Sequence, residues 1–253
     1  MQYETILYEQ KGPVGILSLN RPECLNAVNQ AMSQELKRFL YQRLEDLETR
    51  VLIMTGSGRG FCAGLDMKET MANIPQGGYT PKLAYERQRY FSDLIILMRQ
   101  IPQPIIGAIN GPSAGAGFSF ALACDVCYAA KEAKFSAAYI NIGVGGADMG
   151  SSWLFPRAVG AKNAARYMMT GDLFNADEAL RIGMVQAVFE KEKLMDEAMK
   201  LALNMAGKSP LGLRFTKEAI DINTAGATLE EAIRLEDRNQ SMCISQMTAF
   251  AGK

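Results

Sequence analysis

The stretch that decides the fold is Pro104-Ile-Ile-Gly-Ala-Ile-Asn-Gly-Pro-Ser-Ala-Gly-Ala-Gly117. Its first part, Pro104–Asn110, has the continuous apolar pattern of a strand that is buried on both faces of a parallel sheet. Small residues then fill a turn, and the apolar run Phe118–Ala123 that follows is typical of a short helix. This succession of strand, turn and helix indicates an α/β fold.

A second stretch repeats this pattern. The buried-strand run Val51–Thr55 leads into the turn Gly60-Phe-Cys-Ala-Gly-Leu-Asp-Met-Lys68. Since the first N–H groups of a helix have no partner within it, each turn can present free donors to a ligand. Two such turns side by side would bring two N–H groups to one point, as in an oxyanion hole. In the alternative interpretation, the glycines of both turns serve only tight packing.

The composition excludes several classes of function. The chain has 253 residues, 48% of them hydrophobic, and a formal net charge of zero, which argues against binding to nucleic acid or to a membrane surface. No apolar run approaches the roughly 18 residues of a membrane span. The absence of histidine excludes Ser-His-Asp catalysis and histidine-bound zinc. Five cysteines, and a start without a signal-peptide pattern, predict a reduced cytoplasmic protein with no metal site.

Strand-like and helix-like segments alternate over the first two-thirds of the chain, and the last third is rich in helix patterns. The sequence therefore predicts an α/β core in residues 1–200 and a C-terminal helical region in residues 201–253. The longer expected helices are Asn29–Leu47, Lys191–Gly207, Pro210–Asn223 and Thr228–Met247.

Five motifs together resemble the crotonase, or enoyl-CoA hydratase/isomerase, family, in its order and spacing and over nearly the whole chain. They are Arg21-Pro-Glu-Cys-Leu-Asn-Ala27, Gly60–Lys68, Pro104–Gly111, Ala123-Cys-Asp125 and Arg157-Ala-Val-Gly160. The resemblance implies a spiral of repeated ββα units, an acyl-CoA thioester as substrate, and a homo-oligomer, either a trimer or a hexamer. It implies no separate cofactor, because coenzyme A is part of the substrate.

The resemblance also implies roles for individual residues. The N–H groups of Leu65 and Ala116 match the two oxyanion donors that stabilise a thioester enolate, although the family more often has glycine at the second position. Asp66 matches a residue that braces the first turn. The positions that match coenzyme A contacts are Leu25, Ala27, Ala63 and Lys68.

In proton transfer the chain departs from typical enoyl-CoA hydratases. Their two water-activating glutamates are matched here by Ser119 and Tyr139. A serine without a partner is no base, and a phenol with a pKa near ~10 is a poor base at neutral pH. We therefore expect Ser119 and Tyr139, together with Trp153, to line the acyl pocket.

One acid remains in the matching region. Asp148 resembles the single carboxylate of enoyl-CoA isomerases, although its spacing from Gly143 is longer. One carboxylate can take a proton from one carbon and return it two carbons away, which moves a double bond. We predict this isomerisation, with Asp148 as the proton shuttle in an apolar pocket that raises its pKa. The alternative is a structural aspartate near a helix start.

Other functions stay open at this point. A hydratase, or related enolate chemistry such as thioester hydrolysis or decarboxylation, would use Asp148 or Tyr139 with water. A catalytically silent acyl-CoA binder would keep Leu65 and Ala116 but need no acid. A nucleotide-binding α/β protein is disfavoured, because neither glycine-rich turn fits G-x-x-x-x-G-K-[ST] or G-x-G-x-x-G.

Overall fold

The computed structural model describes residues 3–251, except for the side chains of residues 246–251. Its larger sheet has the strand order β1-β2-β3-β4-β6-β9, parallel except for the β1-β2 hairpin. A smaller sheet has the order β5-β7-β8. The strands are β1 (Ile6–Lys11), β2 (Val14–Leu19), β3 (Val51–Gly56), β4 (Ile105–Ile109), β5 (Ser113–Ala114), β6 (Val126–Ala130), β7 (Lys134–Ser136), β8 (Phe174–Asn175) and β9 (Ala187–Phe189).

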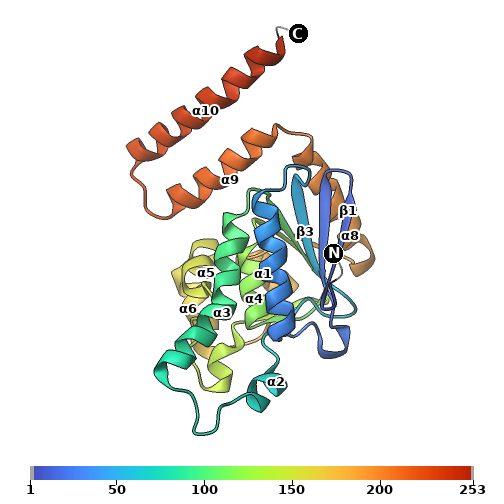
Figure 1. Cartoon of the computed structure of the whole chain (residues 1–253), viewed down its shortest axis with the longest axis vertical. Coiled ribbons are helices and arrows are strands. Elements are labelled where there is room, and N and C mark those ends of the chain that lie inside the picture. Colours follow the sequence, from blue (N-terminus) through green and yellow to red (C-terminus); the bar gives the residue numbers. More distant parts are fainter. Residues whose placement is uncertain (1–2, 252–253) are drawn as a thin grey trace.

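Helices cover both faces of the larger sheet (Figure 1). Because alternate residues of a strand face opposite sides, Leu52 and Met54 of β3 pack into the layer of α1, α3 and α4, whereas Val51 and Ile53 pack against α8. The helices are α1 (Gln30–Leu44), α2 (Met67–Ala72), α3 (Pro81–Gln100), α4 (Ala116–Ala123), α5 (Ser151–Val159), α6 (Ala161–Thr170), α7 (Ala176–Arg181), α8 (Lys191–Ala206), α9 (Pro210–Thr224) and α10 (Leu229–Ala251), with two short 3-10 helices at Pro22–Cys24 and Ala138–Ile142.

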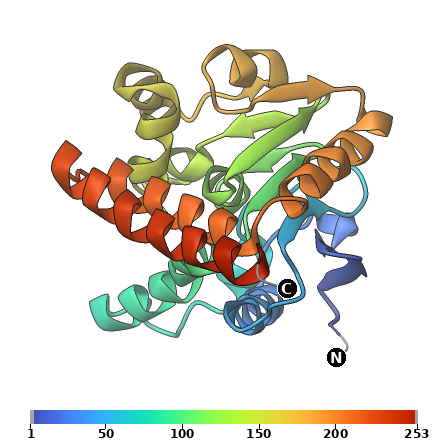
Figure 2. The same cartoon turned by 90° about the horizontal axis from the view of Figure 1, so that it is seen from above.

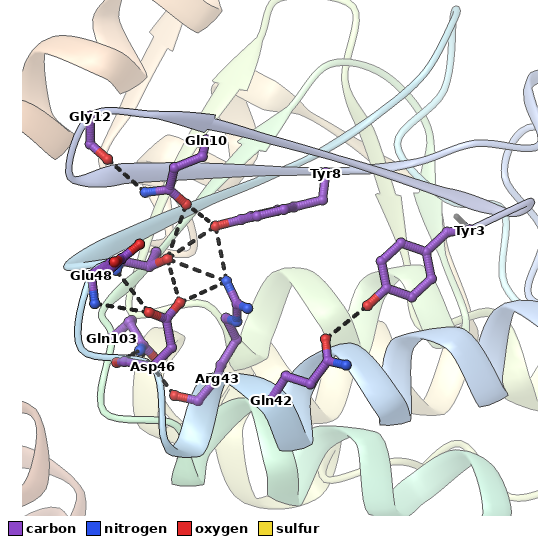
Figure 3. A network of polar contacts seen from close by, with 10 residues as sticks. Tyr3, Tyr8, Gln10, Gly12, Gln42, Arg43, Asp46, Glu48 and Gln103 are labelled. Carbon is purple, nitrogen blue, oxygen red and sulfur yellow. Dashed lines mark hydrogen bonds and ion pairs between the residues drawn. The ribbon is translucent and has the colours of Figure 1, made fainter. Parts of the chain in front are cut away.

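A polar network fastens the turn between α1 and β3 (Figure 3). Arg43 forms an ion pair with Asp46 at 2.7 Å and donates to the hydroxyl of Tyr8 at 2.9 Å. Asp46 also accepts the N–H groups of Glu48 and Thr49, at 2.9 and 3.1 Å. These bonds fix the point at which β3 begins, at the end of the strand opposite the two glycine-rich turns.

The helix predicted to reach Leu47 is wrong at its C-terminal end. α1 ends at Leu44, and the side chain of Leu47 is 91% exposed. The carboxylate of Asp46 offers the following N–H groups an acceptor outside the helix, and such local side-chain bonds compete with helical ones. The apolar spacing of the sequence could not reveal this competition.

The C-terminal helices α9 and α10 lie side by side and stand apart from the sheet (Figures 1 and 2). α9 is held by Lys217, whose ammonium lies 3.2 Å from the carboxylate of Asp125 and donates to the carbonyl of Gln103 at 2.9 Å. Among its side chains up to residue 245, α10 exposes four large apolar ones, which are Leu229, Ile233, Met242 and Ile244. No helix in the described residues is long and apolar enough to cross a membrane.

The predicted α/β core with a helical C-terminal part is confirmed. The predicted boundary at residue 200 falls inside α8, which continues to pack on the sheet through Ala202 and Ala206. The helical region that leaves the sheet therefore begins after Ala206, with α9.

Candidate active site

The two glycine-rich turns lie against each other at the carboxyl ends of β3 and β4. The N–H of Ala114 donates to the carbonyl of Cys62 at 3.0 Å, and the N–H of Cys62 donates to Pro112 at 3.0 Å. Asn110, at the end of β4, adds a reciprocal pair of bonds to the N–H and carbonyl of Gly56 at 3.1 and 2.9 Å. These bonds join the two strand–turn–helix units that begin with β3 and β4 and that the sequence pattern predicts.

Close packing at this junction requires glycine at particular positions. A methyl group added at Gly117 would lie 2.1 Å from the carbonyl oxygen of Cys62, well inside contact distance. A methyl at Gly64 would lie 3.6 Å from the amide nitrogen of Ala116, and Gly64 itself has a φ of +105°. Gly64 and Ala116 are therefore direct neighbours, which brings Leu65, the residue after Gly64, to the start of α4.

The N–H groups of Leu65 and Ala116 have no hydrogen-bond acceptor within residues 3–251. Ala116 is the first residue of α4, so its N–H has no helical partner. Leu65 lies between Gly64 and Asp66, which both bond to Val28, at 2.7 and 2.9 Å. In such a parallel bridge the middle residue directs its N–H away from the partner strand, here away from Val28.

Three of the four predicted coenzyme A contacts come together beside the first turn. The N–H of Ala63 donates to the carbonyl of Leu25 at 2.9 Å, and Leu25 has a left-handed backbone with a φ of +53°. The carbonyl of Ala27 accepts from Arg21 at 2.6 Å. The fourth residue, Lys68, is exposed on α2.

Asp66 caps α2 and binds the guanidinium of Arg21 at 2.9 Å. The hydrogen bond from the N–H of Glu69 is the main factor that lowers the pKa of Asp66, and Arg21 lowers it further. Asp66 is therefore a fixed anion that holds the turn, in agreement with its predicted bracing role. In the described part of the chain, no three acidic or cysteine side chains gather in a way that could hold a metal ion.

Ser119 and Tyr139 form a buried pair of hydroxyl groups. Their oxygens are 2.5 Å apart, and the phenol also donates to the carbonyl of Gly115 at 2.6 Å. Ser119 lies one helical turn beyond Ala116 and is fully buried. Burial raises the pKa of Tyr139 well above its ordinary value, so the phenol stays protonated at neutral pH. Neither hydroxyl group is therefore suited to accept a proton from a ligand at neutral pH.

The backbone of Asp148 lies against the first turn of α4. Its carbonyl oxygen is 3.3 Å from the hydroxyl of Ser119, and its carboxylate accepts the N–H of Met149 at 2.6 Å and the side-chain amide of Gln88 on α3. Burial raises the pKa of Asp148 although both hydrogen bonds lower it. The sequence did not single out Gln88, because it lies 60 residues from Asp148 and carries no local signal.

Trp153 lies on α5 with its ring 3.9 Å from the guanidinium of Arg157, and it is 39% exposed. Within the described residues no hydrogen bond or cation–π contact joins Trp153 to either glycine-rich turn. The role of Trp153 in the acyl pocket therefore stays a prediction.

A family model, enoyl-CoA hydratase/isomerase, matches residues 9–253. The chain belongs to this family. A 1,2-epoxyphenylacetyl-CoA isomerase of Escherichia coli is 37% identical over 92% of this chain and 87% of that protein. A probable enoyl-CoA hydratase of Mycobacterium leprae is also 37% identical, over 90% of this chain and 78% of the relative.

Solved structures agree with this assignment to the enoyl-CoA hydratase/isomerase family. A probable enoyl-CoA hydratase/isomerase from Mycobacterium abscessus has a TM-score of 0.87 and 35% identity, and covers 94% of this chain and 90% of that one. An enoyl-CoA hydratase from Bacillus anthracis has a TM-score of 0.89 and 29% identity, over 98% of this chain and 96% of that one. The predicted crotonase fold and membership of an enzyme family are thereby confirmed.

Proposed function

We propose that this enzyme moves a carbon–carbon double bond in an enoyl-CoA, with the N–H groups of Leu65 and Ala116 on the thioester oxygen and Asp148 as the proton shuttle. The observation that carries the proposal is the arrangement around α4. The N–H of Ala116 at its start has no acceptor within residues 3–251, and Gly64, the neighbour of Leu65, packs against it. The backbone carbonyl of Asp148, an acid whose pKa burial raises, contacts Ser119 in the first turn of α4. The other two candidate groups for proton transfer, Ser119 and Tyr139, are neutral and bonded to each other.

The reaction needs one base that later acts as an acid. The Asp148 carboxylate takes a proton from the carbon next to the thioester, and the electron pair of that C–H bond moves onto the thioester oxygen. Two N–H donors then stabilise the resulting dienolate; one such donor is typically worth roughly 3–4 kcal/mol in the transition state. Protonated Asp148 returns the proton two carbons further along, which converts a 3-enoyl into a 2-enoyl thioester.

A direct test uses 3-hexenoyl-CoA as substrate. The proposal expects the absorbance of a conjugated 2-enoyl thioester to appear without any gain of water in the mass of the product. Asp148→Asn should abolish turnover while leaving acyl-CoA binding in place. Asp172→Asn, at an exposed acid outside the site, is the matched control and should keep full activity. Normal turnover by Asp148→Asn would contradict the proposal.

Hydration is the second candidate, and it is favoured by the names of several relatives, including a crotonyl-CoA hydratase of Syntrophomonas wolfei that is 31% identical. Here Asp148 alone would have to hold and activate the water. A hydratase would consume 2-hexenoyl-CoA with loss of its conjugated absorbance and a gain of one water in mass. A silent binder would take up acyl-CoA but give no turnover with either substrate.

We also propose that the subunit assembles into a homo-oligomer, a trimer or a hexamer, in the cytoplasm. The apolar side chains that α10 exposes support the assembly, and the five unpaired cysteines support a reducing compartment. Light scattering should give a mass of three or six chains, and a monomer would contradict the assembly.

A further inference from the structure

Tyr139 touches the peptide group that supplies the second oxyanion donor. Its hydroxyl donates a 2.6 Å hydrogen bond to the carbonyl oxygen of Gly115, which belongs to the same peptide unit as the N–H of Ala116. The contact is buried, since Tyr139 is only 6% exposed. A buried hydroxyl that donates to the carbonyl of this peptide unit would affect the orientation and the donor strength of its N–H group.

We propose that Tyr139 is a positioning residue, which orients and polarises the Gly115–Ala116 peptide so that its N–H binds the thioester oxygen more strongly. This inference rests on the proposed function, in which the N–H of Ala116 is one of the two donors. It assigns the two hydroxyl groups a role in the oxyanion hole in addition to shaping the acyl pocket.

The geometry of the peptide bond supports this role. A trans peptide is planar, and its C=O and N–H point in opposite directions. A donor that fixes the carbonyl of Gly115 on one side therefore fixes the direction of the Ala116 N–H on the other. The carbonyl also accepts the N–H of Ser119 at 3.1 Å, so two donors hold it. Hydrogen bonds in such a chain polarise each other, by ~10–30% per bond.

The direction of each hydrogen bond can be assigned. A carbonyl can only accept, so the single hydroxyl proton of Tyr139 is committed to Gly115. Ser119 has two acceptors within reach, the hydroxyl of Tyr139 at 2.5 Å and the carbonyl of Asp148 at 3.3 Å. With the proton of Tyr139 on Gly115, we assign the proton of Ser119 to the much shorter contact, so that Ser119 donates to Tyr139. The result is a one-way chain from Ser119 through Tyr139 and the Gly115–Ala116 peptide to the substrate. The raised pKa of Tyr139, caused by burial, keeps its proton in place at neutral pH.

The test measures the thioester carbonyl directly. Butyryl-CoA labelled with carbon-13 at the carbonyl is bound to the enzyme, and its stretching band is isolated by isotope-edited infrared difference spectroscopy. The band should lie at lower frequency on the wild-type enzyme than in water. Tyr139→Phe, which removes only the hydroxyl, should lose part of that shift, and kcat for 3-hexenoyl-CoA should fall about tenfold, the size of one net hydrogen bond.

Two further variants complete the design. Ser119→Ala removes the far end of the chain and should move the band in the same direction by a smaller amount. Tyr167→Phe is the matched control, because Tyr167 is another buried tyrosine whose hydroxyl bonds to Glu178, outside the site. This control should leave both the band and kcat unchanged.

The possible results distinguish the oxyanion hole itself from the positioning role of Tyr139. A wild-type band that matches the free thioester would overturn the oxyanion hole itself, and this inference with it. A wild-type shift that Tyr139→Phe retains in full would overturn this inference alone and leave the proposed function in place. If circular dichroism shows that Tyr139→Phe does not fold, the test uses Ser119→Ala instead. A carbonyl stretching band in Ser119→Ala at the wild-type frequency would then overturn the role of the two hydroxyl groups.

Discussion

The side-chain amide of Gln88 donates a hydrogen bond to the carboxylate of Asp148, which ties α3 to the loop before α5. The N–H of Met149 donates to the same oxygen, Oδ1, at 2.6 Å. Within the described residues no donor reaches Oδ2, so this oxygen is free to accept a proton. Gln88 therefore holds the proposed base in one orientation without occupying its reactive atom.

The pH dependence of turnover should report the pKa of Asp148. Burial raises this pKa, and the base must be ionised, so kcat/KM should rise with pH through a value above the ordinary ~3.9 of an aspartate. The Gln88 bond lowers the pKa, so Gln88→Leu should move the acidic limb to higher pH. A pH–rate profile of both proteins checks this. An acidic limb at the same pH in the wild-type enzyme and in Gln88→Leu would mean that Gln88 does not act on Asp148.

Removal of the charge at Asp148 should not weaken the fold. Because the folded-state pKa is raised, the ionised carboxylate is more favourable in the unfolded chain, and this group lowers stability at pH values above its pKa. Asp148→Asn, which keeps an oxygen for the bonds from Gln88 and Met149, should have an equal or higher Tm at pH 7 while activity is lost. A clear drop in Tm would favour the structural interpretation of Asp148.

The contact between the two turns should be sensitive to a single methyl group. Gly117→Ala places a methyl 2.1 Å from the carbonyl oxygen of Cys62, so the turns must move apart. We expect about a hundredfold loss of kcat, as for a misplacement of roughly 1 Å, and a cost of about 1–3 kcal/mol in unfolding free energy. Gly145→Ala, which meets no atom within 4 Å, is the control. Equal activity in Gly117→Ala and Gly145→Ala would contradict the claim that the two glycine-rich turns together form the active site.

The attachment of α9 should depend on Lys217. Its buried ammonium reaches Asp125 and two carbonyl groups, those of Met98 and Gln103, and burial lowers its pKa although Asp125 raises it. Lys217→Met removes the donor from the carbonyls of Met98 and Gln103 and one of the two cations beside Asp125, so it should lower the unfolding free energy by roughly 1–3 kcal/mol in a urea titration. Lys193→Met, at an exposed position on α8, should cost nothing measurable.

Much of the fold follows from local pattern. The apolar runs of β3 and β4 lie where the sequence predicts them, and α8 (Lys191–Ala206) ends one residue before the predicted Gly207, because apolar periodicity directly reflects burial. The six-residue helix α2 and the two-residue strands β5 and β8 carry too few residues for such a pattern.

The candidate site was predictable only in part. Leu65, Ala116 and Asp148 follow from motifs that keep their order along the chain. The side-chain donors to Asp148 Oδ1 and to the Gly115 carbonyl are Gln88 and Tyr139, and these contacts between distant parts of the sequence exist only after the chain has folded. Trp153 is expected to line the acyl pocket, and the structure adds a partner that the sequence did not indicate, the guanidinium of Arg157 over its ring. Sequence spacing does not determine which side of a helix faces a ligand.

The most direct test of the account is a crystal structure of the enzyme with butyryl-CoA bound. We predict that the thioester oxygen lies within about 3.1 Å of the amide nitrogens of both Leu65 and Ala116, with the Asp148 carboxylate on the side of the carbon next to the thioester. A thioester oxygen bound to water or to side chains, with the two amides unoccupied, would contradict the central claim.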